Sequence, residues 1–127
     1  MNAPDENSLS WRNRRVMARR TGWPAGALAE CERLDREHPG WSFGWLPENR
    51  TRGWERPAGF AANRRDWSLV GADELRRDPE DGVRRRPYVF GPSVAELEQR
   101  IAAIEARHHE EEARREAAWE SMARGLR

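Results

Sequence analysis

Lysine is absent from this sequence, and all 23 basic residues are arginine. This absence excludes any chemistry that needs a lysine amine, such as a Schiff base or a phosphate-binding loop with its lysine. We attribute the arginine content first to codon bias in a GC-rich genome and second to selection for guanidinium groups that bind anions. The formal net charge is only +1, so the chain as a whole is not a general polyanion binder.

Cysteine and long apolar runs are also scarce. The single cysteine, Cys31, cannot form a disulfide within the chain. The longest nearly apolar stretch covers residues 25–29, which is far too short to cross a bilayer. The first residues include Asp5 and Glu6 and no apolar segment, so we expect no secretory signal. Together these features predict a cytoplasmic protein without membrane contact.

Apolar residues make up only 37 % of the 127 residues, charged residues make up 35 %, and the mean hydropathy is −1.06. An ordinary soluble domain has roughly 45–50 % apolar and about 25 % charged residues. The chain therefore has room for one domain with a small core, and part of it must be a solvated tail or an exposed helix.

Charge is divided into alternating blocks. Residues 1–23 carry five arginines against two acids, and residues 24–49 carry two arginines against five acids. Such alternation favours self-docking or oligomerisation at least as well as nucleic-acid binding. We expect a basic, partly disordered N-terminal arm over residues 1–23, a small α+β domain over residues 24–104, and a projecting helix end over residues 105–127.

Helix signals occur at three places. A first helix is predicted over residues 10–20 with Ser10 as its cap, and a second over residues 24–37 with Pro24 in its first turn. The second helix has an apolar stripe of Leu28, Cys31 and Leu34. The longest helix is predicted from Ser93, with Glu96 completing a capping box, to about residue 124. Its apolar stripe, which covers two heptads and then becomes polar, is Val94, Leu97, Ile101 and Ile104.

Strand signals lie between the second and third helices. Aromatic residues alternate over residues 41–45, so Trp41, Phe43 and Trp45 are expected to share one face. Further strands are predicted within 53–63, over 67–70 and over 88–90, with a helical turn at 73–77. We expect Trp41, Trp45, Trp54 and Trp67 to form the core of a small antiparallel sheet, with an exposed aromatic platform as the alternative. The predicted fold class is α+β, with flanking helices and a long charged C-terminal helix.

Residues 37–41 read Glu-His-Pro-Gly-Trp, and an aromatic strand and a later "AELEQRI" helix start follow them. This arrangement resembles a group of small uncharacterised actinobacterial proteins over about residues 27–46 and 88–104. The resemblance implies a helix–β–helix order and a GC-rich bacterial source. It implies no activity, substrate or cofactor.

Residue types that carry chemistry are few. His108 and Glu112 have the spacing of two metal ligands on one helix, but no further histidine or cysteine completes a site. Cys31 lies on an apolar stripe, which favours packing over nucleophilic catalysis. The sequence also lacks a glycine-rich phosphate cradle. We therefore expect no enzyme, no cofactor and no metal.

The remaining signals concern partners. Trp119, Met122 and Leu126 form one apolar stripe near the end of the long helix, beyond the reach of the small core. They predict an interaction, adaptor or regulatory protein that self-associates or binds another protein through this helix. The alternative is a nucleic-acid-binding module that uses Arg12, Arg14, Arg15, Arg19 and Arg20. The two hypotheses differ in salt dependence, since nucleic-acid affinity falls steeply with salt.

Overall fold

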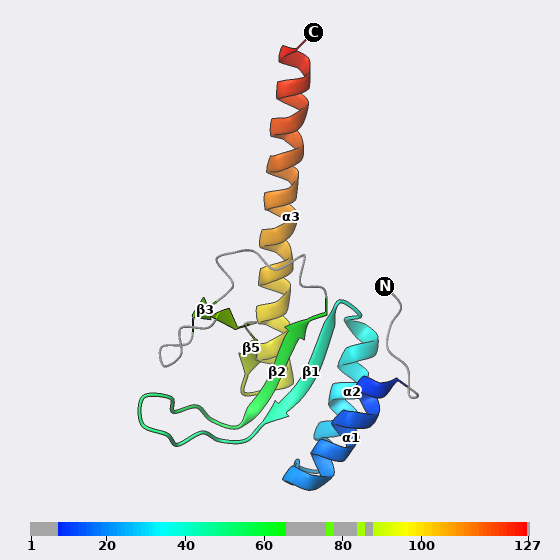
Figure 1. Cartoon of the computed structure of the whole chain (residues 1–127), viewed down its shortest axis with the longest axis vertical. Coiled ribbons are helices and arrows are strands. Elements are labelled where there is room, and N and C mark those ends of the chain that lie inside the picture. Colours follow the sequence, from blue (N-terminus) through cyan, green and yellow to red (C-terminus); the bar gives the residue numbers. More distant parts are fainter. Residues whose placement is uncertain (1–7, 66–75, 78–83, 86–87, 127) are drawn as a thin grey trace.

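The computed structural model describes residues 8–65, 76–77, 84–85 and 88–126 (Figure 1). Two helices, α1 (Leu9–Thr21) and α2 (Ala27–Glu37), precede the sheet, and the long helix α3 (Val94–Gly125) follows it. Between them lies a three-stranded antiparallel sheet. This architecture confirms the α+β fold class.

The sheet consists of β1 (Trp41–Leu46), β2 (Gly59–Arg64) and β5 (Val89–Gly91), in the order β1-β2-β5. Trp41 pairs with Arg64 and Phe60 pairs with Gly91. A separate two-stranded ladder joins β3 (Arg76–Arg77) to β4 (Arg84–Arg85), so the helical turn predicted at 73–77 is wrong for its last two residues. The strand predicted over 67–70, with Trp67, lies outside the described residues.

The core lies on one face of the sheet. Helix α2 packs against β1, and α3 packs against β2 and β5. The buried residues that meet there are Cys31, Leu34, Trp41, Phe43, Ala62, Leu97 and Ile101. The inward-facing residues of β1 and the apolar stripes of α2 and α3 thus pack together in one small core.

The four core tryptophans of the sequence prediction have different surroundings. Trp41 is buried, which confirms its place in the core. Trp45 is half-buried, with its ring centroid 6.4 Å from that of Trp23. Trp54 is 54 % exposed, so its prediction as a core residue is wrong. It lies in the β1–β2 loop, where no strand alternation turns its side chain inward.

The first residues of α1 and α2 differ from the predicted ones. Ser8, not Ser10, caps α1, and its hydroxyl accepts a hydrogen bond from the Trp11 N–H at 3.2 Å. Pro24 lies before α2 and not in its first turn as predicted, because the N-cap of α2 is Gly26, which has a φ of 84°. Ser93 caps α3 as predicted, since its hydroxyl accepts from the Glu96 N–H at 3.2 Å.

Helix α1 packs on the domain instead of standing apart from it, in contrast to the N-terminal arm expected over residues 1–23. Trp11 is only 1 % exposed, and Ala18 and Arg14 are also buried. The spacing i, i+3, i+7 places these three residues on one face of α1, next to α2. Helix α1 is therefore part of the folded unit.

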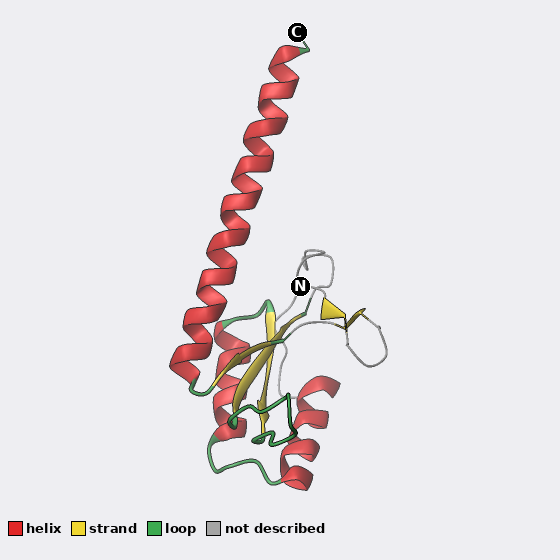
Figure 2. Ribbon diagram, turned by 90° about the vertical axis from the view of Figure 1, so that its left-hand side faces the viewer, coloured by secondary structure: helices red, strands yellow, loops and turns green. Residues whose placement is uncertain are grey.

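Helix α3 starts at a tight junction with β5. A Cβ atom on Gly91 would lie 2.5 Å from the backbone nitrogen of Leu97, so this turn accepts only glycine without movement. From there the 32 residues of α3 extend about 48 Å. The second half of α3 leaves the domain (Figure 2). Among the described residues, no helix has the length and apolar content that a membrane span requires.

Candidate interaction surfaces

The five arginines predicted to bind nucleic acid do not form one surface. Arg14 points into the protein, where its Nη1 donates to Asp35 Oδ2 at 2.7 Å. Arg15 Nε donates to Glu32 Oε1 at 2.9 Å, on the neighbouring helix α2. The other three members of the set are exposed: Arg12, Arg19 and Arg20. The acidic helix α2 thus binds part of the basic helix α1, as the alternating charge blocks suggested.

Asp35 is the centre of a buried polar network. Its side chain is 0 % exposed, and Oδ1 accepts from the backbone N–H of Phe43 at 3.1 Å. Arg14 Nη1 also donates to the carbonyl of Phe43 at 2.9 Å, and Arg65 Nη2 lies 3.3 Å from Asp35 Oδ2. Burial lowers the pKa of the Arg65 guanidinium, Asp35 opposes this shift and Arg14 adds to it. One carboxylate therefore pairs with the buried Arg14 and the half-buried Arg65, and this network has a structural role.

Trp11 completes the α1–α2 contact. The guanidinium carbons of Arg14, Arg15 and Arg36 lie 5.3, 5.7 and 5.5 Å from its ring centroid. A guanidinium within about 6 Å of an aromatic ring is attracted by the ring quadrupole. The sequence signal for this docking is the spacing of Trp11, Arg14 and Ala18, which places all three on one face of α1. Sequence reasoning missed it because an arginine is normally expected on the solvent side of a helix.

The stripe predicted to bind a partner is exposed. Trp119 and Met122, in the half of α3 that projects from the domain, and Leu126, the residue that caps its end, are 71 %, 62 % and 87 % exposed (Figure 2). Trp119 lies 18 residues, or five turns, after Ile101, so both residues occupy the same side of a straight helix. The stripe therefore continues the side of α3 that covers the sheet, beyond the point where the sheet ends.

Acidic side chains form a row beside this stripe. Glu112, Glu116 and Glu120 are exposed and follow one another at i+4 spacing, which aligns them along the helix. A surface with an apolar centre and a charged border has the composition of a protein-binding site. We call Trp119, Met122, Leu126 and this acidic row the α3 tip.

His108 and Cys31 have structural roles. His108 Nδ1 lies 3.3 Å from Arg64 Nη1, so this histidine contacts β2. Cys31 is fully buried, and desolvation raises the pKa of its thiol from 9.0 to about 12. A thiol that stays protonated at neutral pH is a poor nucleophile and a poor metal ligand. This agrees with the prediction that Cys31 packs in the core.

Within the described residues, Glu37, His38 and Glu98 form one cluster of possible metal ligands. Sequence reasoning missed it, because His38 and Glu98 are 60 positions apart. His38 Nε2 lies 3.3 Å from Glu98 Oε2, and Arg33 Nη1 donates to Glu37 Oε2 at 2.7 Å. These contacts account for the cluster as a link between the end of α2 and α3, and we assign no metal to it.

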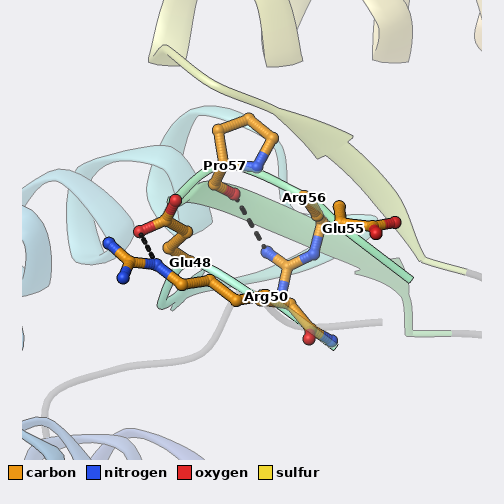
Figure 3. A pocket seen from close by; sticks show the side chains of 6 residues that line it. Glu48, Arg50, Glu55, Arg56 and Pro57 are labelled. Atoms are coloured by element: carbon orange, nitrogen blue, oxygen red, sulfur yellow. Dashed lines mark hydrogen bonds and ion pairs between the residues drawn. The ribbon is translucent and has the colours of Figure 1, made fainter. Parts of the chain in front are cut away.

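A shallow hollow lies on the loop between β1 and β2 (Figure 3). Asn49 and Arg56 close the loop through two backbone hydrogen bonds of 2.8 and 2.9 Å. Arg50 Nε donates to Glu48 Oε2 at 3.1 Å on the exposed side. Catalytic acids and bases normally need desolvation or a specific charged partner in a cleft. The open surface and mutually paired charges of this hollow do not provide that setting.

No family model, curated protein or solved structure matches this chain. The resemblance at residues 37–41 therefore stays a prediction.

Proposed function

We propose that this chain is a small, non-enzymatic cytoplasmic interaction module that binds a protein partner through the α3 tip and acts as an adaptor or regulator. The observation that supports this proposal best is the exposure of Trp119, Met122 and Leu126 on one side of a helix that has left its own core. Fully burying such a side chain stabilises a complex by about 1.5–3 kcal/mol. Tryptophan is also among the residues that contribute most to protein interfaces.

The nucleic-acid alternative has weaker support. Two of its five arginines, Arg14 and Arg15, bind acidic side chains of α2. Arginines that already neutralise a carboxylate release few counterions when a phosphate backbone approaches. An affinity for RNA or DNA that falls steeply with salt would favour this alternative.

The α3 tip is tested by comparing wild type with the double variant Trp119→Glu/Met122→Glu. The solution mass of each chain is measured by sedimentation, and each tagged chain is used to capture partners from cells of its own source. The matched control is Ala117→Glu/Ser121→Glu, which adds the same charge to the opposite side of α3.

We expect the first variant to lose a partner, either a second copy or another protein, that wild type and the control variant retain. If all three chains have the same mass and capture the same proteins, the α3 tip has no binding role and the proposal is refuted. A helical circular dichroism signal from each chain verifies that α3 is still formed.

A further inference from the structure

The outer side of α1 is a second surface with apolar and charged side chains together. Leu9, Val16 and Met17 are exposed there. Leu9 and Val16 are seven positions apart, which places them two turns apart on the side opposite Trp11. Three exposed arginines share this side: Arg12 and Arg19 lie along one border, and Arg20 lies between Val16 and Met17. The docked side of α1 is used by the domain, and this outer side remains accessible.

This outer side of α1 complements the α3 tip. Each surface has three exposed apolar side chains, and the acidic row supplies three glutamates for the three arginines of α1, while Arg115 lies on the line of the apolar stripe. Their lengths also agree, because the 13 residues of α1 extend about 20 Å and residues 112–126 extend about 22 Å. Complementary charge around an apolar centre fixes the orientation of a helix pair and selects its partner.

The two surfaces of a single copy lie at opposite ends of the molecule. Figures 1 and 2 show α1 low on the domain, whereas α3 carries the C-terminal end far from it. A continuous helix of 32 residues does not bring its end back to its own domain. A contact between the α3 tip and α1 therefore requires two copies of the chain.

Pairing of two α3 helices is the competing arrangement, and it is less favourable. In an antiparallel pair with two-fold symmetry, the same border of each helix faces its copy, so the acidic row would meet itself. In a parallel pair, the partner helix would have to approach the side of α3 where Leu97 and Ile101 already cover the sheet. Helix α1 of another copy offers opposite charge without either conflict.

We propose that the α3 tip of one copy binds the outer side of α1 in a second copy. This inference rests on the proposed function and names its partner. The contact joins two different surfaces, so it is heterologous, and it forms either a closed ring or an open chain. Trp119, Met122 and Leu126 pack on Leu9, Val16 and Met17, and the glutamate row faces the arginines.

Charge reversal on each surface tests this contact. The tip variant carries Glu112→Arg, Glu116→Arg and Glu120→Arg, and the α1 variant carries Arg12→Glu, Arg19→Glu and Arg20→Glu. Sedimentation velocity over a concentration series measures the mass relative to the 14.8 kDa of one chain. We expect wild type to associate and each variant alone to associate at least about tenfold more weakly.

Mixing the two variants is the decisive measurement. The reversed tip of one chain then meets the reversed α1 of the other, and the two unchanged surfaces also match, so the mixture is expected to assemble. A chain that carries all six substitutions is expected to recover self-association. This recovery also shows that the substituted helices fold.

Three results would overturn the inference: a monomeric wild type, an α1 variant that associates as wild type does, or a mixture that stays monomeric. Each of them leaves the proposed function open to its own test, because the Trp119→Glu/Met122→Glu variant reports on the α3 tip whatever its partner is. If the tip variant alone loses self-association, the partner is a second copy but its binding surface is not α1.

Discussion

Replacing Asp35 by Asn should destabilise this protein more than any other single substitution of an acidic residue in the described part of the chain. Asn preserves the volume and an oxygen that accepts from the Phe43 N–H. It removes the negative charge that lies 2.7 Å from Arg14 Nη1 and 3.3 Å from Arg65 Nη2. The folded state then keeps the buried Arg14 and the half-buried Arg65 without their shared counterion.

The magnitude follows from the geometry. Two opposite unit charges about 4 Å apart attract each other by about 4 kcal/mol at an effective dielectric constant of about 20. Breaking a buried ion pair by removing one partner costs about 3–5 kcal/mol, because the remaining charge stays buried. The free energy of unfolding of a small domain is about 5–15 kcal/mol, so this loss is a large fraction of the total stability. We expect the melting temperature to fall by about 10–20 °C.

Urea unfolding followed by circular dichroism measures the effect. The matched control is Glu32→Gln, the same acid-to-amide change on the same helix, which weakens a half-exposed pair with Arg15. Its expected cost is below about 1 kcal/mol. If Asp35→Asn costs no more than Glu32→Gln, the account of a buried carboxylate that holds two arginines is wrong.

Four further predictions concern packing and protonation. Trp11→Ala should cost about 3–5 kcal/mol in the same unfolding assay, because the ring is buried between α1 and α2; a melting temperature near that of wild type would mean that α1 is dispensable. Trp54→Ala should change stability by less than about 0.5 kcal/mol, since its side chain is half exposed, and a larger loss would place it in a core. Gly91→Ala should cost at least about 1–3 kcal/mol, because its methyl group meets the backbone of Leu97, and an unchanged melting curve would contradict this close approach. The pKa of the Cys31 thiol is about 12 in the folded state and 9.0 in the unfolded state, so above pH 9.0 only the unfolded state loses this proton. The contribution of Cys31 to stability should therefore be full below pH 9.0 and fall above it by up to about 1.4 kcal/mol per pH unit. Cys31→Ala should lack this slope, and equal slopes in both chains would refute the pKa shift.

The elements with strong local signals were predictable from the sequence. The serine cap and the 3-4 apolar repeat located α3, and the alternating aromatic residues located β1. The docking of α1 was not predictable in the same way, because it depends on Arg14 meeting Asp35, 21 positions away. A charged residue on a helix is normally counted as solvated, so hydrophobic periodicity gave no weight to the face that is in fact buried.

For the α3 tip, in contrast to α1, the sequence was sufficient to find the surface. The spacing of Trp119, Met122 and Leu126 predicted an apolar stripe, and all three side chains are exposed in the structure. The partner of this stripe stays a prediction, because no described residue of the same chain covers these three side chains. The outer side of α1 carries no comparable sequence signal, because arginines are interspersed with its apolar residues Leu9, Val16 and Met17.

The network around Asp35 has a further consequence for the free edge of the sheet. Alternate residues of β1 pair with β2, and Phe43 turns its backbone N–H and carbonyl the other way. Asp35 accepts from that N–H and Arg14 donates to that carbonyl, so the two side chains imitate the hydrogen bonds of an adjoining strand. An exposed strand edge is a template on which further chains can pair and aggregate. Proteolytic removal of α1 would take Arg14 away and leave the Phe43 carbonyl without this donor, so the shortened chain is expected to pair through this sheet edge more readily than the whole chain.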